Sequence, residues 1–167
     1  MKFKVPVNEP CFFGNEKKYL LKCIKDGFIS STGQFVKEFE KKFAKRLNRK
    51  FAITVSNGTA ALHLALQAYG IGREDEVLVP SLTYISSFQS ITASGSKPIA
   101  CDVSEENYLL NLVDAEKRIT AKTKAIMPVH YTGGVGNLKA VYKFAEKNNL
   151  RVIEDAAHAF GTIYNNK

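Results

Sequence analysis

The stretch Glu76-Val77-Leu78-Val79-Pro80 decides the fold prediction, because its three central residues are apolar without alternation. A strand with one solvated face alternates apolar and polar residues, whereas a strand covered on both faces is apolar throughout. The run Val152-Ile153 has the same character. Both runs therefore predict strands of a parallel sheet with helices packed on each side.

Strands and helices alternate along the chain on both sides of this stretch. We expect strands at residues 51–55, 76–79, 98–103, 125–130 and 151–154, where short apolar runs occur. Apolar residues recur at helical spacing between them, at about 59–69, 85–94, 113–119 and 138–148. This order predicts an α/β fold with right-handed crossovers.

Residues 1–50 differ from the rest of the chain in charge and in pattern. They hold 13 Lys or Arg and five Asp or Glu, so they carry the whole net charge of +8. Apolar residues recur at helical spacing over 16–26 and 36–47, which places the intervening lysines on the solvated face of amphipathic helices. We therefore predict an N-terminal helical segment, 1–50, followed by an α/β domain, 51–167. Attraction of nucleic acid or another anionic ligand is the alternative for the basic segment.

The composition excludes several classes of protein. Hydrophobic residues make up 45% and charged residues 24% of the 167 residues, which is a globular balance. No run of about 18 apolar residues predicts a transmembrane helix, and residues 1–9 lack the apolar core of a signal peptide, so we expect a cytoplasmic protein. Three widely spaced cysteines and three scattered histidines predict neither a disulfide framework nor a metal site.

In an open parallel sheet, ligands bind beyond the carboxyl ends of the strands. Directly after the first expected strand come Ser56-Asn57-Gly58-Thr59-Ala60. Ser56 or Asn57 can cap the helix that follows, and the free N–H groups of Gly58, Thr59 and Ala60 would then form an anion site at its N-terminus. The alternative is a plain N-cap with no ligand.

Three further side chains follow other strands at the same edge. Tyr84 follows the second strand, where its ring would either line the crevice or pack in the core. Asp155 ends the fifth strand, and its carboxylate is costly to bury unless a donor or cation meets it. That partner is either a protein group or a cationic nitrogen of a ligand, and His158 lies within reach of the same ligand.

Several blocks of sequence together resemble one family. In chain order these blocks are residues 28–33, 55–66, 75–80, 123–130 and 152–159. They resemble the DegT/DnrJ/StrS-type nucleotide-sugar aminotransferases, which are fold type I enzymes dependent on pyridoxal phosphate (PLP). The similarity runs from about residue 5 to residue 167, and the run 6–33 is similar to perosamine-synthase-type members.

The resemblance implies a fold, an activity and partners. The fold would be the large domain of a fold type I PLP-transferase, with a parallel-rich sheet flanked by helices, incomplete at the C-terminus. The activity would be transfer of an amino group from glutamate to a keto sugar carried on a nucleotide. The enzyme would be a cytoplasmic homodimer, with no nucleic acid or membrane as partner.

The resemblance also implies roles for particular residues. Gly58 and Thr59 match the positions that hold the cofactor phosphate, and Tyr84 matches the aromatic residue that stacks on the pyridine ring. Asp155 matches the carboxylate that pairs with the pyridine nitrogen, and His158 matches a position near the 3-oxygen. Ser30 and Ser31 match a loop near the substrate.

One feature of the family is missing from these residues. The family's Schiff-base lysine lies well beyond the Asp155 position, and the sequence ends before it. Residues 162–167 read as a short strand entering a turn, and Lys167 belongs to that turn. We therefore expect an N-terminal portion of such an enzyme, without a catalytic lysine and inactive alone. A PLP-dependent sugar dehydratase of the same family, or a non-catalytic truncated homologue, is the alternative.

Overall fold

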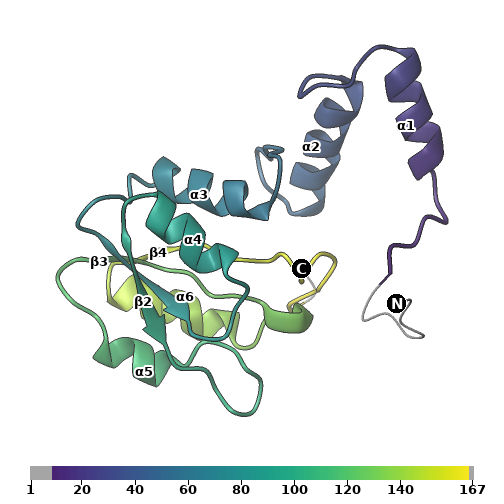
Figure 1. Cartoon of the computed structure of the whole chain (residues 1–167). Helices are drawn as coiled ribbons and strands as arrows, with labels where there is room; N and C mark the ends of the chain where they lie inside the picture. The colour runs from purple at the N-terminus through teal and green to yellow at the C-terminus, as the bar shows by residue number, and fades with distance from the viewer. Residues whose placement is uncertain (1–8, 166–167) are drawn as a thin grey trace, which may run out of the picture. The chain divides into compact units, whose positions relative to one another are not determined.

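The computed structural model describes residues 9–165, which form two compact units divided between Thr54 and Val55 (Figure 1). The N-terminal unit contains α1 (Glu16–Lys25) and α2 (Gln34–Arg46), close to the predicted helices. Ala44 is the one buried hydrophobic residue among its described residues. The rings of Tyr19 and Phe35 lie 4.9 Å apart between centroids and connect the two helices.

The second unit contains a four-stranded parallel sheet in the order β2-β1-β3-β4. Its strands are β1 (Glu76–Pro80), β2 (Lys97–Cys101), β3 (Thr123–Ile126) and β4 (Arg151–Val152). Its helices are α3 (Gly58–Ala68), α4 (Ser86–Ala93), α5 (Leu112–Lys117) and α6 (Leu138–Lys147), with a 3₁₀ turn at Tyr131–Gly133. The α/β fold with a parallel sheet flanked by helices is confirmed.

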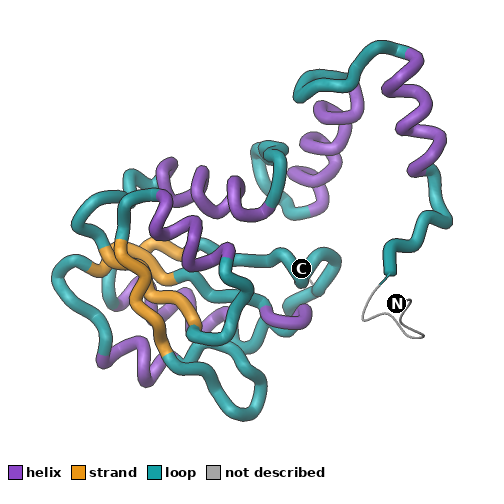
Figure 2. Tube along the Cα trace, in the orientation of Figure 1, coloured by secondary structure: helices purple, strands orange, loops and turns teal. Residues whose placement is uncertain are grey.

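Two apolar clusters cover the two faces of the sheet, with α3 and α4 on one side and α5 and α6 on the other (Figures 1 and 2). Val77 and Val79 belong to the cluster with α3 and α4, whereas Leu78 belongs to the opposite cluster. All three side chains are fully buried, as the unbroken apolar run predicts. Because both faces of the sheet are covered by apolar clusters, polar side chains lie at the carboxyl ends of the strands.

The predicted strand at residues 51–55 is wrong. These residues are irregular and cross the boundary between the two units, and the side chains of Phe51 and Ile53 are about three-quarters exposed. A strand needs a neighbouring strand for its backbone groups, and the described residues provide none here. The N–H of Thr54 instead donates to the carboxylate of Glu40, at 2.8 Å.

Three other predicted strands end earlier than expected, since β2 ends at Cys101, β3 at Ile126 and β4 at Val152. The ladder between β3 and β4 stops at Ile126 and Val152, and a single bridge between Val129 and Asp155 follows. Pro128 lies between these two points and has no N–H to donate. The strand predicted from residue 162 is wrong as far as residue 165, since residues 162 and 163 are irregular and a bend and a turn follow at 164 and 165. Lys167 lies outside the described residues.

None of the helices in residues 9–165 has the length and apolarity needed to cross a bilayer.

Candidate functional site

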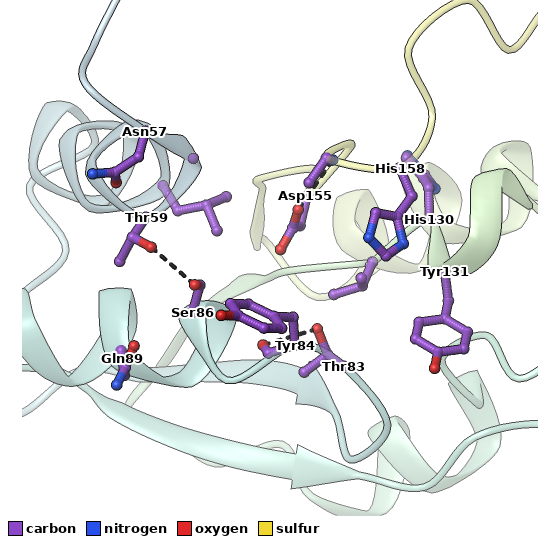
Figure 3. Close-up of a pocket in the computed structure, with 14 residues that line it drawn as sticks. Asn57, Thr59, Thr83, Tyr84, Ser86, Gln89, His130, Tyr131, Asp155 and His158 are labelled. Atoms are coloured by element: carbon purple, nitrogen blue, oxygen red, sulfur yellow. Dashed lines mark hydrogen bonds between the residues drawn. The ribbon is translucent and has the colours of Figure 1, made fainter. Parts of the chain in front are cut away.

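A cavity of about 460 Å³ lies at the edge of the sheet that the sequence analysis singled out (Figure 3). Its lining comes from the start of α3 and from the segments that follow β1, β3 and β4. The lining residues include Asn57, Gly58, Thr59, Thr83, Tyr84, Ser86, Gln89, His130, Tyr131, Asp155 and His158. The five residues predicted to contact the cofactor, Gly58, Thr59, Tyr84, Asp155 and His158, therefore share one cavity. Its size is within the range of small-molecule sites, roughly 300–1,000 Å³.

The N-terminus of α3 forms one wall of the cavity. Asn57 is the N-cap, and its side-chain oxygen accepts the N–H of Ala60 at 2.9 Å. Ala60 is therefore not a free donor, which corrects the predicted set of three. The N–H groups of Gly58 and Thr59 have no acceptor within the described chain, as is usual for the first turn of a helix. The cap therefore leaves the N–H groups of Gly58 and Thr59 as two backbone donors that an anion could accept.

The Asp155 carboxylate is buried, with only 8% of the residue exposed. The Ser87 hydroxyl donates to its Oδ2 at 2.8 Å, and the N–H of Ala157 donates to its Oδ1 at 3.2 Å. No lysine or arginine within residues 9–165 forms an ion pair with it. Its partners among the described residues are neutral, so within this part of the chain no cation balances the buried carboxylate that lines the cavity.

Two aromatic side chains and a histidine line the same cavity as this carboxylate. Tyr84 is 71% exposed and lines the cavity, so the alternative that it packs in the core is wrong. The rings of Tyr131 and His158 lie 6.2 Å apart between centroids. Figure 3 shows the Asp155 carboxylate pointing into the space between the start of α3 and the Tyr84 ring. A flat, cationic heteroaromatic ring would find both a stacking surface and a counter-charge in this space.

A second network holds the strand end from the opposite side of the sheet. Glu154 accepts a hydrogen bond from the Tyr142 hydroxyl of α6, and its other oxygen lies 2.7 Å from Nε2 of the buried His130. The backbone N–H of His130 donates to the backbone oxygen of Asp155 at 3.0 Å. These contacts fix the backbone that carries Asp155.

Ser30 and Ser31, the residues predicted near the substrate, belong to the N-terminal unit. Ser30 lines a cavity of about 100 Å³ inside that unit, beside Phe28 and Gly33. Ser31 is exposed. Both residues lie in the loop between α1 and α2.

The hydroxyl groups of α4 and of the loop before it were not among the residues predicted from the sequence. Thr83, Ser86 and Ser87 are near the cavity, and Ser87 touches Asp155 directly. A signal for them exists in the sequence, since Ser87 and Ser90 lie on the same helical face as the buried Ile91. A polar residue on a buried helix face has a partner inside the protein.

The chain matches known proteins over nearly its whole length. The model of the DegT/DnrJ/EryC1/StrS aminotransferase family matches residues 10–167. A GDP-perosamine synthase of Escherichia coli O157:H7 is 46% identical over 163 residues, which are 98% of this chain and 45% of that protein. A GDP-perosamine synthase of Caulobacter vibrioides is 47% identical, over 98% of this chain and 44% of that protein. The chain thus spans less than half the length of these relatives.

Solved structures agree with this result. An aminotransferase from Psychrobacter cryohalolentis superposes with a TM-score of 0.88 at 36% identity, over 93% of this chain and 40% of that one. NtdA from Bacillus subtilis, solved with bound pyridoxamine phosphate (PMP), the aminated form of PLP, superposes with a TM-score of 0.82 at 30% identity. That match covers 87% of this chain and 33% of that one.

Proposed function

This chain belongs to the DegT/DnrJ/EryC1/StrS aminotransferase family, and from that premise we propose that it forms the PLP-binding part of a sugar aminotransferase. The reaction would move an amino group from glutamate to a keto sugar carried on a nucleotide. The names of the GDP-perosamine synthases support a nucleotide-linked sugar as substrate. The observation that carries the proposal is the buried Asp155 carboxylate, which lines the same cavity as the start of α3 and has no cationic partner among the described residues.

The residues present fit PLP. The free N–H groups of Gly58 and Thr59 would hold the phosphate at the helix N-terminus. Asp155 would pair with the ring nitrogen and Tyr84 would stack on the ring, while His158 would lie near the 3-oxygen. The hydroxyl of Thr59 donates to Ser86 at 2.9 Å, so it would have to turn to donate to a phosphate.

When bound, PLP supplies an electron sink for the carbanion at the amino-bearing carbon. The residues of the chain would set how strongly the cofactor ring withdraws electrons. Asp155 would hold a proton on the ring nitrogen, because a buried carboxylate favours a cationic partner. Tyr84 and the start of α3 would fix the plane of the ring and the phosphate.

We assign the remaining predicted features to the complete enzyme. Ser30 and Ser31 would contact the sugar substrate, and the enzyme would act as a cytoplasmic homodimer. No lysine is among the described residues that line the cavity. These 167 residues alone would therefore bind the cofactor without completing amino transfer, which needs a lysine to hold the cofactor covalently and to move protons.

The first test measures the affinity of the chain for PMP. We expect Asp155→Asn to raise the dissociation constant roughly tenfold or more, since hydrogen bonds to charged groups contribute about 1.5–3 kcal/mol. Asp102→Asn is the control, because that exposed carboxylate also follows a strand and does not line the cavity. Equal affinities for the two variants, or no PMP binding by the unmodified chain, would refute the proposal.

The second test follows the products by mass spectrometry. The chain is mixed with PLP, glutamate and a nucleotide-linked keto sugar, and a full-length relative serves as the active control. We expect no amino sugar from the 167 residues. An amino sugar would show that the chain is active alone, and a deoxy sugar without an amino group would favour the dehydratase alternative.

A further inference from the structure

A chain of hydroxyl groups reaches the Asp155 carboxylate from α4. Ser87 is fully buried, and its Oγ lies 2.8 Å from Oδ2 of Asp155. The hydroxyl of Thr83 lies 2.8 Å from the same Oγ. Ser87 and Asp155 are 68 positions apart in the sequence, so this contact exists only in the folded chain.

The direction of these hydrogen bonds follows from the chemistry of the groups. An ionised carboxylate only accepts hydrogen bonds, so the single proton of the Ser87 hydroxyl is donated to Asp155. Thr83 must then donate to the oxygen of Ser87. Its other acceptor, the backbone oxygen of Tyr84, is more distant at 3.3 Å. The hydroxyl of Thr83 thus donates to Ser87, and the hydroxyl of Ser87 donates to the carboxylate.

Ser90 shows that burial of a serine on this helix does not by itself lead to Asp155. Ser90 is also fully buried, but its hydroxyl donates to the backbone oxygen of Ser87, at 2.9 Å within the same helix. Ser87 instead donates across to the segment after β4. Together with the N–H of Ala157, it occupies one lone pair on each oxygen of Asp155 and so fixes the rotation of the carboxylate.

We propose that Ser87, supported by Thr83, is a positioning residue that aims the Asp155 carboxylate at the ring nitrogen of the cofactor. This inference rests on the proposed function. Without the Ser87 hydroxyl, the carboxylate is free to rotate and loses its alignment with the ring nitrogen. Binding energy from the phosphate is unaffected, because the start of α3 is a separate part of the cavity.

The test compares two ligands that differ only at the ring nitrogen. These are PMP and its deaza analogue, in which a C–H group replaces that nitrogen. The ratio of their dissociation constants, measured by titration calorimetry, reports the nitrogen–carboxylate pairing alone. We expect the unmodified chain to prefer PMP, and Ser87→Ala to lose roughly three- to tenfold of this preference while binding the deaza analogue unchanged.

Ser90→Ala is the matched control, since it removes an equally buried hydroxyl from the same helix. We expect it to keep the full preference for PMP. Thr83→Val, which preserves side-chain shape at a partly exposed position, should lose a smaller part of the preference, and it provides the test if Ser87→Ala does not fold.

The outcomes separate this inference from the proposed function. If the unmodified chain prefers PMP and Asp155→Asn abolishes that preference, the proposed function stands. If Ser87→Ala then keeps the full preference for PMP, the role of Ser87 is refuted. If only Thr83→Val folds, the same result with that variant refutes it. If the unmodified chain binds both ligands equally, the pairing of Asp155 with the ring nitrogen is refuted, and the role of Ser87 with it.

Discussion

Asp155 shows how a single residue can be placed for a ligand at a cost to the folded chain. Its carboxylate is buried with two neutral donors and no cation among the described residues. A buried charge without a counter-charge is unfavourable for folding. A cationic ring nitrogen in the cavity would remove that cost, so ligand binding and relief of the buried charge are the same event.

Cys101 provides a prediction at the scale of one residue. Burial raises the pKa of its thiol from 9.0 to about 11, and the nearby Asp114 carboxylate contributes. Cys11 is exposed and Cys23 is partly exposed. Because the thiolate is the reactive form, we expect a disulfide reagent at pH 8 to modify Cys11 and Cys23 in the folded chain, and Cys101 only after denaturant is added. Three equal reaction rates would contradict this.

The same pKa shift makes stability depend on alkaline pH. The folded state holds the Cys101 proton more tightly than the unfolded state, so its contribution is present below pH 9 and is lost as the pH rises toward 11. Urea unfolding from pH 8 to 11 measures this loss. Cys101→Ala should reduce the dependence, whereas Cys11→Ala should not.

Single residues differed in how far the sequence could predict them. Gly58, Thr59, Tyr84 and Asp155 were found because they follow expected strands or a helix start, which a linear pattern shows. Ser87 was not found, because its partner is 68 positions away and only the folded chain brings the two together. The roles of these residues toward a cofactor stay predictions.

At the scale of elements, the N-terminus of α3 combines a cap with a candidate phosphate site. Asn57 Oδ1 accepts the N–H of Ala60, and loss of such a cap costs about 1 kcal/mol. We expect Asn57→Ala to lower the free energy of unfolding by about this amount in urea titrations. Asn57→Asp should keep the stability, since Asp caps as well as Asn, but should weaken PMP binding several-fold because its charge faces the phosphate.

A cap at another helix is the control for this prediction. Asn137 caps α6 in the same way, accepting the N–H of Ala140 at 3.0 Å, and does not line the main cavity. Asn137→Asp should therefore preserve both stability and PMP affinity. If Asn57→Asp also preserved PMP affinity, the phosphate would not bind at α3.

The elements themselves were predictable where local pattern and tertiary contacts agree. The helices lie within a few residues of the predicted ranges, because each has one apolar face and a polar cap or turn at its ends. The segment 51–55 is apolar like a strand but has no neighbouring strand in the described chain, so local pattern alone gave the wrong result. Pairing partners, unlike propensity, are not visible along the sequence.

At the scale of the whole chain, apolar burial and charge are unevenly distributed. The unit from Val55 onward holds both apolar clusters and carries no net charge, whereas the N-terminal unit holds the entire +8. Helix α1 buries none of its residues, and it exposes Leu20, Leu21 and Ile24 by more than half. Exposed apolar side chains at this helical spacing are typical of an interface.

We expect this surface to pair two copies of the chain, in line with the proposed homodimer. Self-association should strengthen as salt rises from about 50 to 500 mM, because salt screens the repulsion between two like-charged units. Sedimentation velocity measures this. Ile24→Asn should weaken association without changing the charge, and Lys18→Gln, which lowers the charge without touching the apolar residues, should strengthen association at low salt.

Nucleic-acid binding through the same basic unit would weaken with salt instead. Retention of DNA that falls with salt, together with unchanged association in Ile24→Asn, would favour the basic segment as a polyanion site over the pairing of two copies.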